Sequence, residues 1–194
     1  MRSPVTLRKA EQTDAAALVD LWSMVMRKAD REDLVADVLR IVSECRDTGD
    51  GCIVVADYAG EVAGAVYLRA TTITPVNLEP VVQAIHPHVA PRFQGRGVGR
   101  ALMEAAVTYA EERGIAHVAT AAIAGSRDAN RFFARLALGP MATLRLAPTN
   151  VVRAKLSAGS RHSAGVRPSR QLAQVLAARR SLRGSRESAP EAAG

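Results

Sequence analysis

The sequence predicts an α/β protein with one mixed-sheet domain over residues 3–150 and a basic extension over residues 151–194. Three observations support this prediction. The chain of 194 residues is 48% hydrophobic and 23% charged, as expected for a chain that folds around a buried core. Strand-like and helix-like segments alternate through the first of these regions. Basic and acidic side chains balance there at 17 each, whereas the extension holds nine basic and two acidic ones.

Six strands are expected where apolar residues alternate or run together between turn residues: 5–10, 52–57, 62–70, 81–90, 115–123 and 141–147. Residues 58–61 form a hairpin between the second and third strands, and a proline-bearing connection at 74–80 leads to the fourth. Four helices are expected from helical spacing of apolar residues: one beginning near residue 14, then 33–45, 100–113 and 126–138. Thr13 or Asp14 caps the first helix, and Ser126 or Asp128 caps the last.

The most informative segment is a glycine-rich loop between the fourth strand and the third helix. It reads RFQGRGVGRAL over residues 92–102, with glycines at 95, 97 and 99. Glycine adopts positive φ angles and lets a ligand approach the backbone, and the first turn of a helix offers unpaired N–H groups. The combination predicts a phosphate-binding loop. Neither a P-loop, which needs Lys followed by Ser or Thr, nor a Rossmann fingerprint fits these residues.

The same loop and its surroundings resemble the GNAT N-acetyltransferase superfamily. The pattern Gln94-x-x-Gly97-x-Gly99 is similar to the acyl-CoA loop of that family, and residues 89–91 (VAP) are similar to the end of its fourth strand. Residues 58–64 and 131–136 resemble its hairpin and its Arg-Phe-Tyr helix. The resemblance covers roughly residues 3–148. It implies a mostly antiparallel sheet that splays between its fourth and fifth strands, with flanking helices and acyl-CoA in the gap.

The resemblance also implies residues for the co-substrate, acetyl-CoA. The backbone of Val89 would pair with the pantetheine arm, and Gln94 belongs to the loop motif. The pyrophosphate would receive backbone N–H groups from the loop and the start of the helix: Gly95, Arg96, Gly97, Val98, Gly99 and Arg100. Asn130 would replace an asparagine of the family that falls on Ser126. No metal is expected, because Cys45 and Cys52 do not have the spacing of a metal site.

The sequence departs from the family where acid–base groups usually sit. The family's tyrosine falls on Phe133, and its carboxylate falls on Ala121. His88 is the candidate replacement base, since His86 and His88 are two apart on a strand and should share a face. Ser126 would supply part of the missing hydrogen bonding. Three alternatives stay open: transfer by proximity alone, transfer with a recruited acid or base, or binding of acyl-CoA without turnover.

The predicted function is transfer of an acetyl group from acetyl-CoA to an amine of a small molecule, a protein lysine or a protein N-terminus. The rivals are a catalytically silent acyl-CoA-binding regulator and a protein that binds nucleic acid through its basic extension, where a linker at 157–168 and an amphipathic helix at 169–184 are expected. A homodimer is left open. The first 14 residues lack the apolar core of a signal peptide, and no apolar run of the sequence is long enough to cross a membrane, so a cytoplasmic protein is expected.

Overall fold

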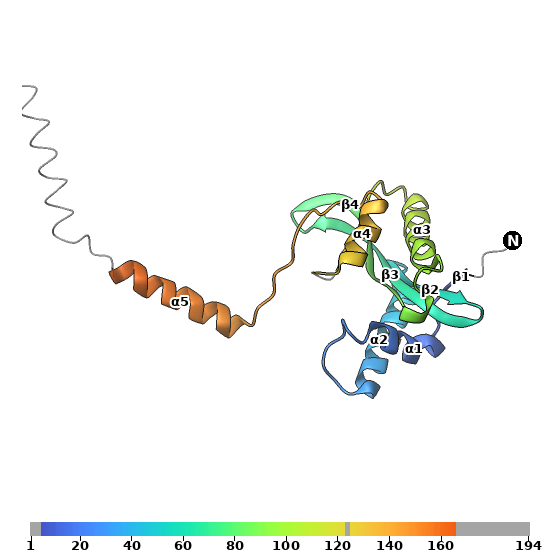
Figure 1. The fold of residues 1–194 in the computed structure, drawn as a ribbon, viewed down its shortest axis with the longest axis horizontal. Coiled ribbons are helices and arrows are strands. Elements are labelled where there is room, and N and C mark those ends of the chain that lie inside the picture. Colours follow the sequence, from blue (N-terminus) through green and yellow to red (C-terminus); the bar gives the residue numbers. More distant parts are fainter. Residues whose placement is uncertain (1–4, 123–124, 166–194) are drawn as a thin grey trace, which may run out of the picture. The chain divides into compact units, whose positions relative to one another are not determined.

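A computed structural model describes residues 5–122 and 125–165, and the chain divides into two units, Met1–Gly139 and Pro140–Gly194. The first unit contains a mixed sheet and its helices (Figure 1). Its strands are β1 (Val5–Lys9), β2 (Gly51–Tyr58), β3 (Glu61–Thr74), β4 (Asn77–Val89) and β5 (Val118–Thr120). Its helices are α1 (Ala15–Trp22), α2 (Arg31–Thr48), α3 (Val98–Glu111) and α4 (Arg127–Arg135), with short 3-10 turns at Gln12–Asp14 and Pro91–Phe93.

The five strands lie in the order in which they occur in the chain. β1 to β4 are joined as antiparallel neighbours, and β5 pairs with β4 in parallel. The predicted mixed sheet is therefore confirmed. A tight turn of two residues, Pro75 and Val76, joins β3 to β4. The parallel pairing is short, running only from Val82 opposite Val118 to Ala84 opposite Thr120.

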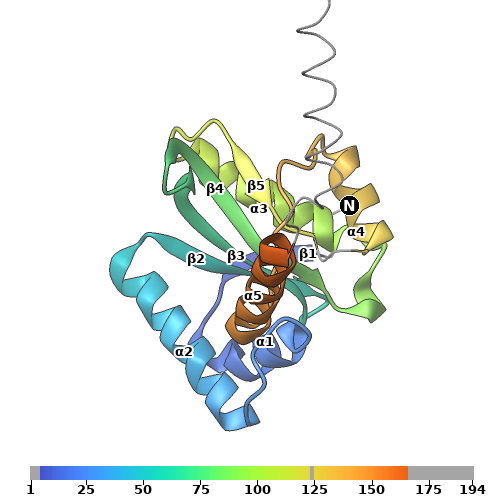
Figure 2. The same cartoon turned by 90° about the vertical axis from the view of Figure 1, so that its left-hand side faces the viewer.

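Helices cover both faces of the sheet, so that the first unit has three layers (Figure 2). Alternation along β2 shows how one strand serves two cores. Cys52, Val54 and Ala56 face the side of α3, whereas Ile53 and Val55 face α1 and α2. Because side chains on a strand point to opposite faces in turn, a continuous apolar run such as CIVVA is what a strand buried on both faces requires.

The core between the sheet and α3 has little room, and Gly64 of β3 shows this directly. A Cβ atom at Gly64 would lie 2.6 Å from the backbone oxygen of His88, 3.0 Å from Cγ1 of Val98 and 3.2 Å from Cδ1 of Leu102. Leu102 and Val98 are themselves buried, at 0% and 1% exposure. The missing side chain therefore lets α3 and β4 approach β3 closely, which fixes the depth of the helix against the sheet.

A charged cluster ties the start of the chain to the first helix. Arg8 of β1 donates to Asp14 at 2.6 and 2.8 Å and to Asp57 of β2 at 2.7 Å. Asp14 is buried, and it also accepts the backbone N–H of Glu11 at 2.7 Å, which closes a capping box ahead of α1. The hydrogen bonds from Arg8 hold the pKa of the Asp14 carboxyl below its ordinary value of 3.8.

Several expected boundaries were wrong. β4 begins at Asn77 instead of 81, so the expected connection at 74–80 is a hairpin. Pro80 fits inside the strand because β5 pairs only from Val82 onward and leaves that edge free of a ladder. α3 covers Val98–Glu111 instead of 100–113, and the fifth strand is limited to Val118–Thr120 instead of 115–123.

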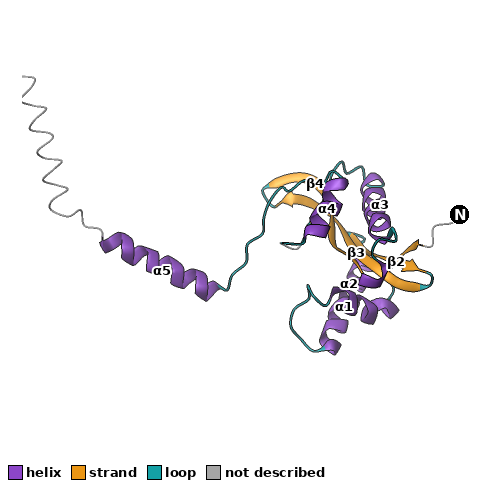
Figure 3. Cartoon of the chain, in the orientation of Figure 1, coloured by secondary structure: helices purple, strands orange, loops and turns teal. Residues whose placement is uncertain are grey.

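The expected sixth strand at 141–147 does not form. Figure 3 draws this segment as a loop, and Met141, Leu144 and Leu146 are exposed. An apolar, strand-like pattern becomes a strand only where a neighbouring strand supplies hydrogen bonds. The second unit instead contains α5 (Thr149–Gly165). The linker expected at 157–168 was therefore wrong for residues 157–165, which are helical. The amphipathic helix expected at 169–184 lies outside the described residues.

We predict that Gly64→Ala lowers the free energy of unfolding by about 1–3 kcal/mol, as overpacking of a filled core does. The clash involves a backbone oxygen, which cannot move without shifting β4. Gly139→Ala is the matched control, since a Cβ atom there meets nothing within 4 Å and the residue has no positive φ. Urea unfolding of both variants tests this, and equal stabilities of the two would contradict it.

A second prediction concerns Asp14→Asn. Because the folded-state pKa of Asp14 lies below its unfolded value, the pair with Arg8 stabilises the fold above about pH 4, and that stabilisation is lost as the pH falls through the lower pKa. We expect the variant to lose about 1.5–3 kcal/mol at neutral pH and the loss to shrink below pH 4. Thermal melts across pH measure this. Asp20→Asn, which removes an exposed pair with Arg31, should cost much less.

Candidate functional site

A large cavity of the first unit opens where β4 and β5 part. It has a volume of about 600 Å³ and is lined by the end of β4, the loop before α3, the residues after β5, and α4. The last paired residues are Ala84 and Thr120, and there the Thr120 hydroxyl donates to the Ala84 carbonyl at 2.8 Å. The Thr120 side chain thus occupies the Ala84 carbonyl, which would accept a backbone N–H if β5 were longer. Beyond that point residues 85–89 of β4 have no partner strand among the described residues on this side.

A β-bulge lies in this unpaired part of β4. Ala65 of β3 is opposite His88 and Tyr67 is opposite Ile85, so two residues of β4, His86 and Pro87, share the single place between them. His86 adopts a positive φ of 48°. The extra residue reverses the alternation of the strand for everything that follows it. His86 and His88 therefore do not share a face as a regular strand would require, and that expectation was wrong.

The backbone of Val89 is directed into the cavity. Ala90 donates its N–H to Ala63 of β3 at 2.9 Å, and neighbouring residues of an antiparallel ladder direct their polar groups to opposite edges. The N–H and C=O of Val89 therefore point away from β3, toward the side that β5 has left open. Gln94 of the glycine loop donates its Nε2 to the Val89 carbonyl at 3.4 Å, which ties the loop to the end of the strand.

The loop itself is a concave backbone surface at the N-terminus of α3. Gly95 and Gly97 have φ angles of 75° and 85°, and a Cβ atom on either would meet nothing within 4 Å. Residues other than glycine rarely adopt such angles. The open space lies beside the unpaired N–H groups and the positive end of α3, an arrangement that suits a phosphate group. The residues present therefore fit the pyrophosphate of an acyl-CoA.

The third glycine of the loop has a different role. Gly99 lies within α3, and a Cβ atom there would reach ordinary contact with Cζ of Phe132 and Cγ2 of Val89, at 3.5 and 3.6 Å. The fold would accept alanine at this position, but the methyl group would occupy the floor of the cavity. Val98, beside it, is buried in the core, so only its backbone is available to a ligand.

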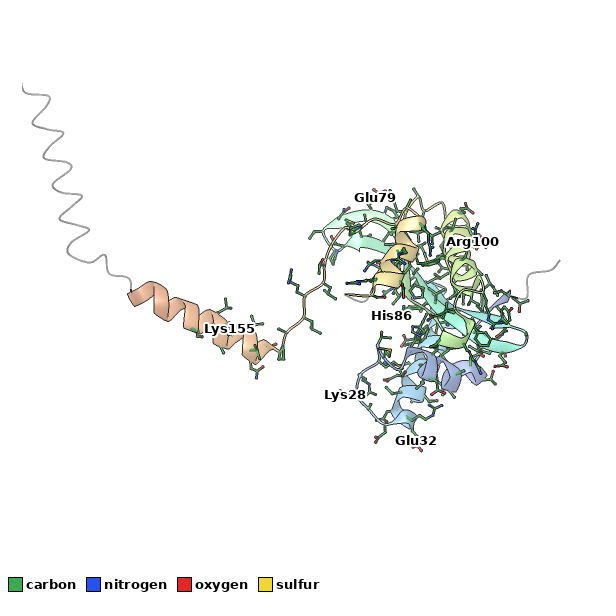
Figure 4. All side chains as sticks on the ribbon, viewed as in Figure 1. Lys28, Glu32, Glu79, His86, Arg100 and Lys155 are labelled. Atoms are coloured by element: carbon green, nitrogen blue, oxygen red, sulfur yellow. The ribbon has the colours of Figure 1, made fainter. Side chains whose placement is uncertain are left out.

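The arginines of this region make local contacts, and Figure 4 labels one of them, Arg100 of α3. Arg100 lines the cavity and pairs with Glu104 at 2.9 Å. Arg96 lies over the ring of Tyr58, 5.3 Å from its centroid, and does not line the cavity. Arg92 pairs with Glu61 at 2.7 Å.

The opposite wall is apolar and comes from the residues after β5 and from α4. Phe132 and Phe133 lie with ring centroids 5.4 Å apart, and Ala121 and Ala122 line the cavity beside them. The positions at which the sequence lacks the family's tyrosine and carboxylate, Phe133 and Ala121, are therefore both at the cavity. Their side chains can enclose a ligand but cannot transfer a proton.

Ser126 and Asn130 are occupied with the start of α4. Ser126 is the N-cap, and its hydroxyl accepts the N–H of Ala129 at 3.4 Å. Asn130 turns back and donates its Nδ2 to the Ser126 carbonyl at 2.8 Å. Ser126 lines the cavity and Asn130 is not among the residues that do. The structure thus brings Ser126 to the site and directs the Asn130 amide to its own helix.

His88 is half-buried and lies between two cavities. It lines the large cavity and also a second one of about 480 Å³, which it shares with residues of α1. Burial, and to a smaller extent the neighbouring His86, lower the pKa of the His88 imidazole below its ordinary value of 6.5. The imidazole is therefore neutral at neutral pH and able to accept a proton. His86 is exposed and also lines the large cavity.

Comparisons with known proteins agree with this geometry. Residues 15–138 match the acetyltransferase (GNAT) family. The chain belongs to the GNAT acetyltransferase family. No curated protein matches the chain.

Several solved structures share the GNAT fold at low sequence identity. A transcriptional regulator from Bacillus halodurans C-125 is 21% identical with a TM-score of 0.64, over 74% of this chain and 99% of that chain. A glucosamine-6-phosphate N-acetyltransferase from Arabidopsis thaliana is 18% identical with a TM-score of 0.59, over 75% and 98%. An aminoglycoside N-acetyltransferase in complex with CoA is 16% identical with a TM-score of 0.62, over 75% and 94%.

Sequence reasoning missed several residues of this GNAT site. The large cavity is also lined by Trp22 at the end of α1 and by Val25 just after it, as well as by Phe132, Asp128 and Arg135. A tryptophan at helical spacing among apolar residues carries no local signal of a ligand site. Its place at the cavity depends on how α1 lies against β4, which is a tertiary contact.

Residues 5–122 and 125–165 lack two further features. No group of three or more His, Cys, Asp and Glu side chains is arranged there to hold a metal ion. None of the helices in residues 5–122 and 125–165 is both long and apolar enough to cross a membrane.

We predict that Gly97→Glu abolishes binding of CoA. The new side chain would fill the open space of the loop, and its carboxylate would repel the phosphates. Gly60→Glu is the matched control, because Gly60 has almost the same φ, 87°, and equally open space but lies in the β2–β3 hairpin. Both variants carry the same backbone strain, so calorimetry with CoA separates strain from loss of the site. Micromolar affinity in folded Gly97→Glu would contradict the prediction.

Proposed function

We propose that this GNAT protein is an N-acetyltransferase that moves an acetyl group from acetyl-CoA to an amine of a small molecule or of a protein, in the cytoplasm. One observation carries the proposal: the glycine loop, the exposed backbone of Val89 and the apolar wall of α4 surround one cavity between β4 and β5. The names of two structural neighbours, which act on glucosamine-6-phosphate and on aminoglycosides, support an amine as the acceptor.

The residues of the cavity divide the work of binding. Acetyl-CoA supplies an activated thioester. The backbone N–H groups of Gly95, Gly97 and the first turn of α3 would hold its pyrophosphate, assisted by the helix dipole. Val89 would pair with the pantetheine arm as a neighbouring strand does, and its N–H would polarise the thioester carbonyl. Holding the thioester against this edge lets an acceptor attack within a fixed geometry.

Proton transfer is assigned to His88. An amine attacks only in its neutral form, so a proton must leave the ammonium, and His88 is the imidazole at the cavity that is half-buried and neutral at neutral pH. Ser126 would contribute a hydroxyl at the opposite wall, although that hydroxyl also caps α4. Phe133 stands where a proton donor would return a proton to the departing thiolate, so this chain would leave that step to water.

The apolar wall formed by α4 and the residues after β5 favours a second candidate function. With Phe133 and Ala121 at the cavity in place of a proton donor and a carboxylate, the chain could bind acyl-CoA as a sensor without turnover. Two measurements separate the alternatives. Calorimetry with acetyl-CoA tests the site itself, and release of free thiol with a panel of amines tests transfer. The panel should contain an aminoglycoside, a lysine peptide, an α-amino dipeptide and an arylalkylamine. Binding of acetyl-CoA without release of thiol would establish the sensor. Absence of binding would refute both the acetyltransferase and the sensor.

We predict that Phe133→Tyr raises turnover, or at least does not lower it, on the best amine of that panel. The added hydroxyl would stand at the wall of the cavity, where a well-placed general acid is worth about 10²–10⁴-fold. The measurement is kcat under saturating acetyl-CoA. A tenfold drop in a folded, CoA-binding variant would show that the Phe133 ring is needed as an apolar wall.

The pH dependence should identify the base. The pKa of His88 is lowered from 6.5. In a plot of kcat against pH we therefore expect one acidic limb, in which kcat falls as the pH drops below 6.5. His88→Gln should reduce kcat about 10²-fold and remove this limb. His86→Gln is the control: the loss of a neighbouring positive charge should move the limb slightly upward in pH without removing it. A limb that persists in His88→Gln would assign the proton transfer to another group.

A further inference from the structure

The indole of Trp22 holds the bulge of β4. Its Nε1–H donates to the backbone carbonyl of His86 at 3.0 Å, across 64 positions of sequence. Trp22 is the last residue of α1 and is 8% exposed, and its ring lines the large cavity together with His86. The bulge has turned this carbonyl out of the sheet toward α1. The hydrogen bond is therefore a direct link between the first helix and the bulged residue.

The conformation that Trp22 holds is a strained one. His86 has a positive φ of 48°, which costs a non-glycine residue free energy because Cβ approaches the carbonyl oxygen. The next residue is Pro87, whose ring restricts the residue before it to extended conformations. Both effects oppose the observed backbone, so the bulge persists only where surrounding contacts hold it. The hydrogen bond from Trp22 is such a contact, and it is made to the strained residue itself.

The bulge determines which residues reach the site. Before it, Val82 and Ala84 face the core on the side of α3. In a regular strand His88 would face the same side. After the extra residue Val89 is the one that packs on that core, and His88 lines the second cavity with Ala17 and Leu21 of α1. Without the bulge, the His88 side chain would face the side of α3, and the N–H and C=O of Val89 would point toward β3 instead of into the cavity.

We propose that Trp22 is a positioning residue for acyl transfer: by holding the His86 carbonyl it fixes the bulge that places His88 and the Val89 backbone at the cavity. This role rests on the proposed function, because it concerns the same site. The hydrogen bond of Trp22 is made to His86 and to neither of the groups that it positions. Its effect should therefore appear in the rate of the chemical step more than in the binding of acetyl-CoA, whose phosphates the loop before α3 would hold.

The first experiment compares Trp22→Phe with the parent chain. Phenylalanine retains an aromatic ring but has no N–H, so the bond to His86 is lost. With the best amine of the panel we expect kcat to fall about tenfold or more, since small displacements of reacting groups have large effects on rate, while the Kd for acetyl-CoA changes less than about threefold. Val19→Ala is the control. It removes packing from the buried face of α1, where Val19 is 3% exposed, and should lower the Tm without this fall in kcat.

The second experiment asks whether Trp22 acts through His86. Glycine adopts positive φ without steric cost, so in a His86→Gly background the bulge no longer depends on the hydrogen bond. We expect Trp22→Phe to reduce kcat less than about threefold in that background. An equal loss in both backgrounds would show that Trp22 acts only as a wall of the cavity, and the proposal would be wrong. Unchanged kcat in Trp22→Phe alone would also overturn it.

A third measurement needs neither substrate nor turnover. Trp22 is the only tryptophan of the chain, so its indole N–H gives a single resonance in a proton–nitrogen spectrum. We expect its exchange with solvent to be slowed at least about tenfold relative to a free indole. Exchange at the free rate in the folded protein would refute the hydrogen bond even if Trp22→Phe fails to fold. Calorimetry with acetyl-CoA tests the proposed function separately. Slow indole exchange without binding of acetyl-CoA would support the hydrogen bond from Trp22 to His86 and would contradict the proposed acetyltransferase function.

Discussion

The end of β4, where one extra residue interrupts the pairing with β3, governs the rest of the site. The bulge at His86 and Pro87 reverses the alternation of the strand, so that Val89 packs toward α3 and His88 toward α1. It begins two residues after Ala84, the last residue that pairs with β5. Beyond that point β4 has a free edge, and a free edge is a surface on which an extended ligand can add as a strand. The cavity of this GNAT protein is the space that the interrupted pairing leaves.

Close packing elsewhere in the fold offsets the backbone strain at His86. The core is built mainly from Val, Leu and Ala, with Leu18, Leu68 and Leu102 fully buried on the two faces of the sheet. Gly64 lets α3 lie close against β3 and β4, so the helix that presents the phosphate cradle is fixed in depth. The cluster of Arg8, Asp14 and Asp57 similarly fixes the start of α1 on the sheet. Elements that are fixed by packing therefore meet at the glycine-containing loop.

The chemistry that this site supports depends more on placement than on acid–base groups. Phe133 and Ala121 leave the cavity wall without a titratable group at the two positions where the sequence resemblance would put one. In the proposed function the thioester is already activated, so holding it beside an amine would supply a large part of the acceleration, and His88 would add proton transfer. This division explains why the backbone geometry of β4 matters so much. A site with few catalytic side chains relies on the positions of those that it has.

The sequence by itself determined the order of the elements through α4, the β2–β3 hairpin, a cap of α4 at Ser126 or Asp128 and the glycine loop before α3, because each depends on residues close together in the chain. Glycines at 95 and 97 with a helix behind them indicate a phosphate site without any knowledge of the fold. Tertiary structure decided the rest. Whether a strand-like segment such as 141–147 pairs depends on a neighbouring edge. Pro87 is a local signal that the strand is interrupted, but the faces of His86 and His88 depend on the register of the bulge, which the pairing with β3 sets. Trp22 reaches the site only because α1 packs against β4, and contacts between residues far apart in sequence leave no periodic pattern from which they could be read.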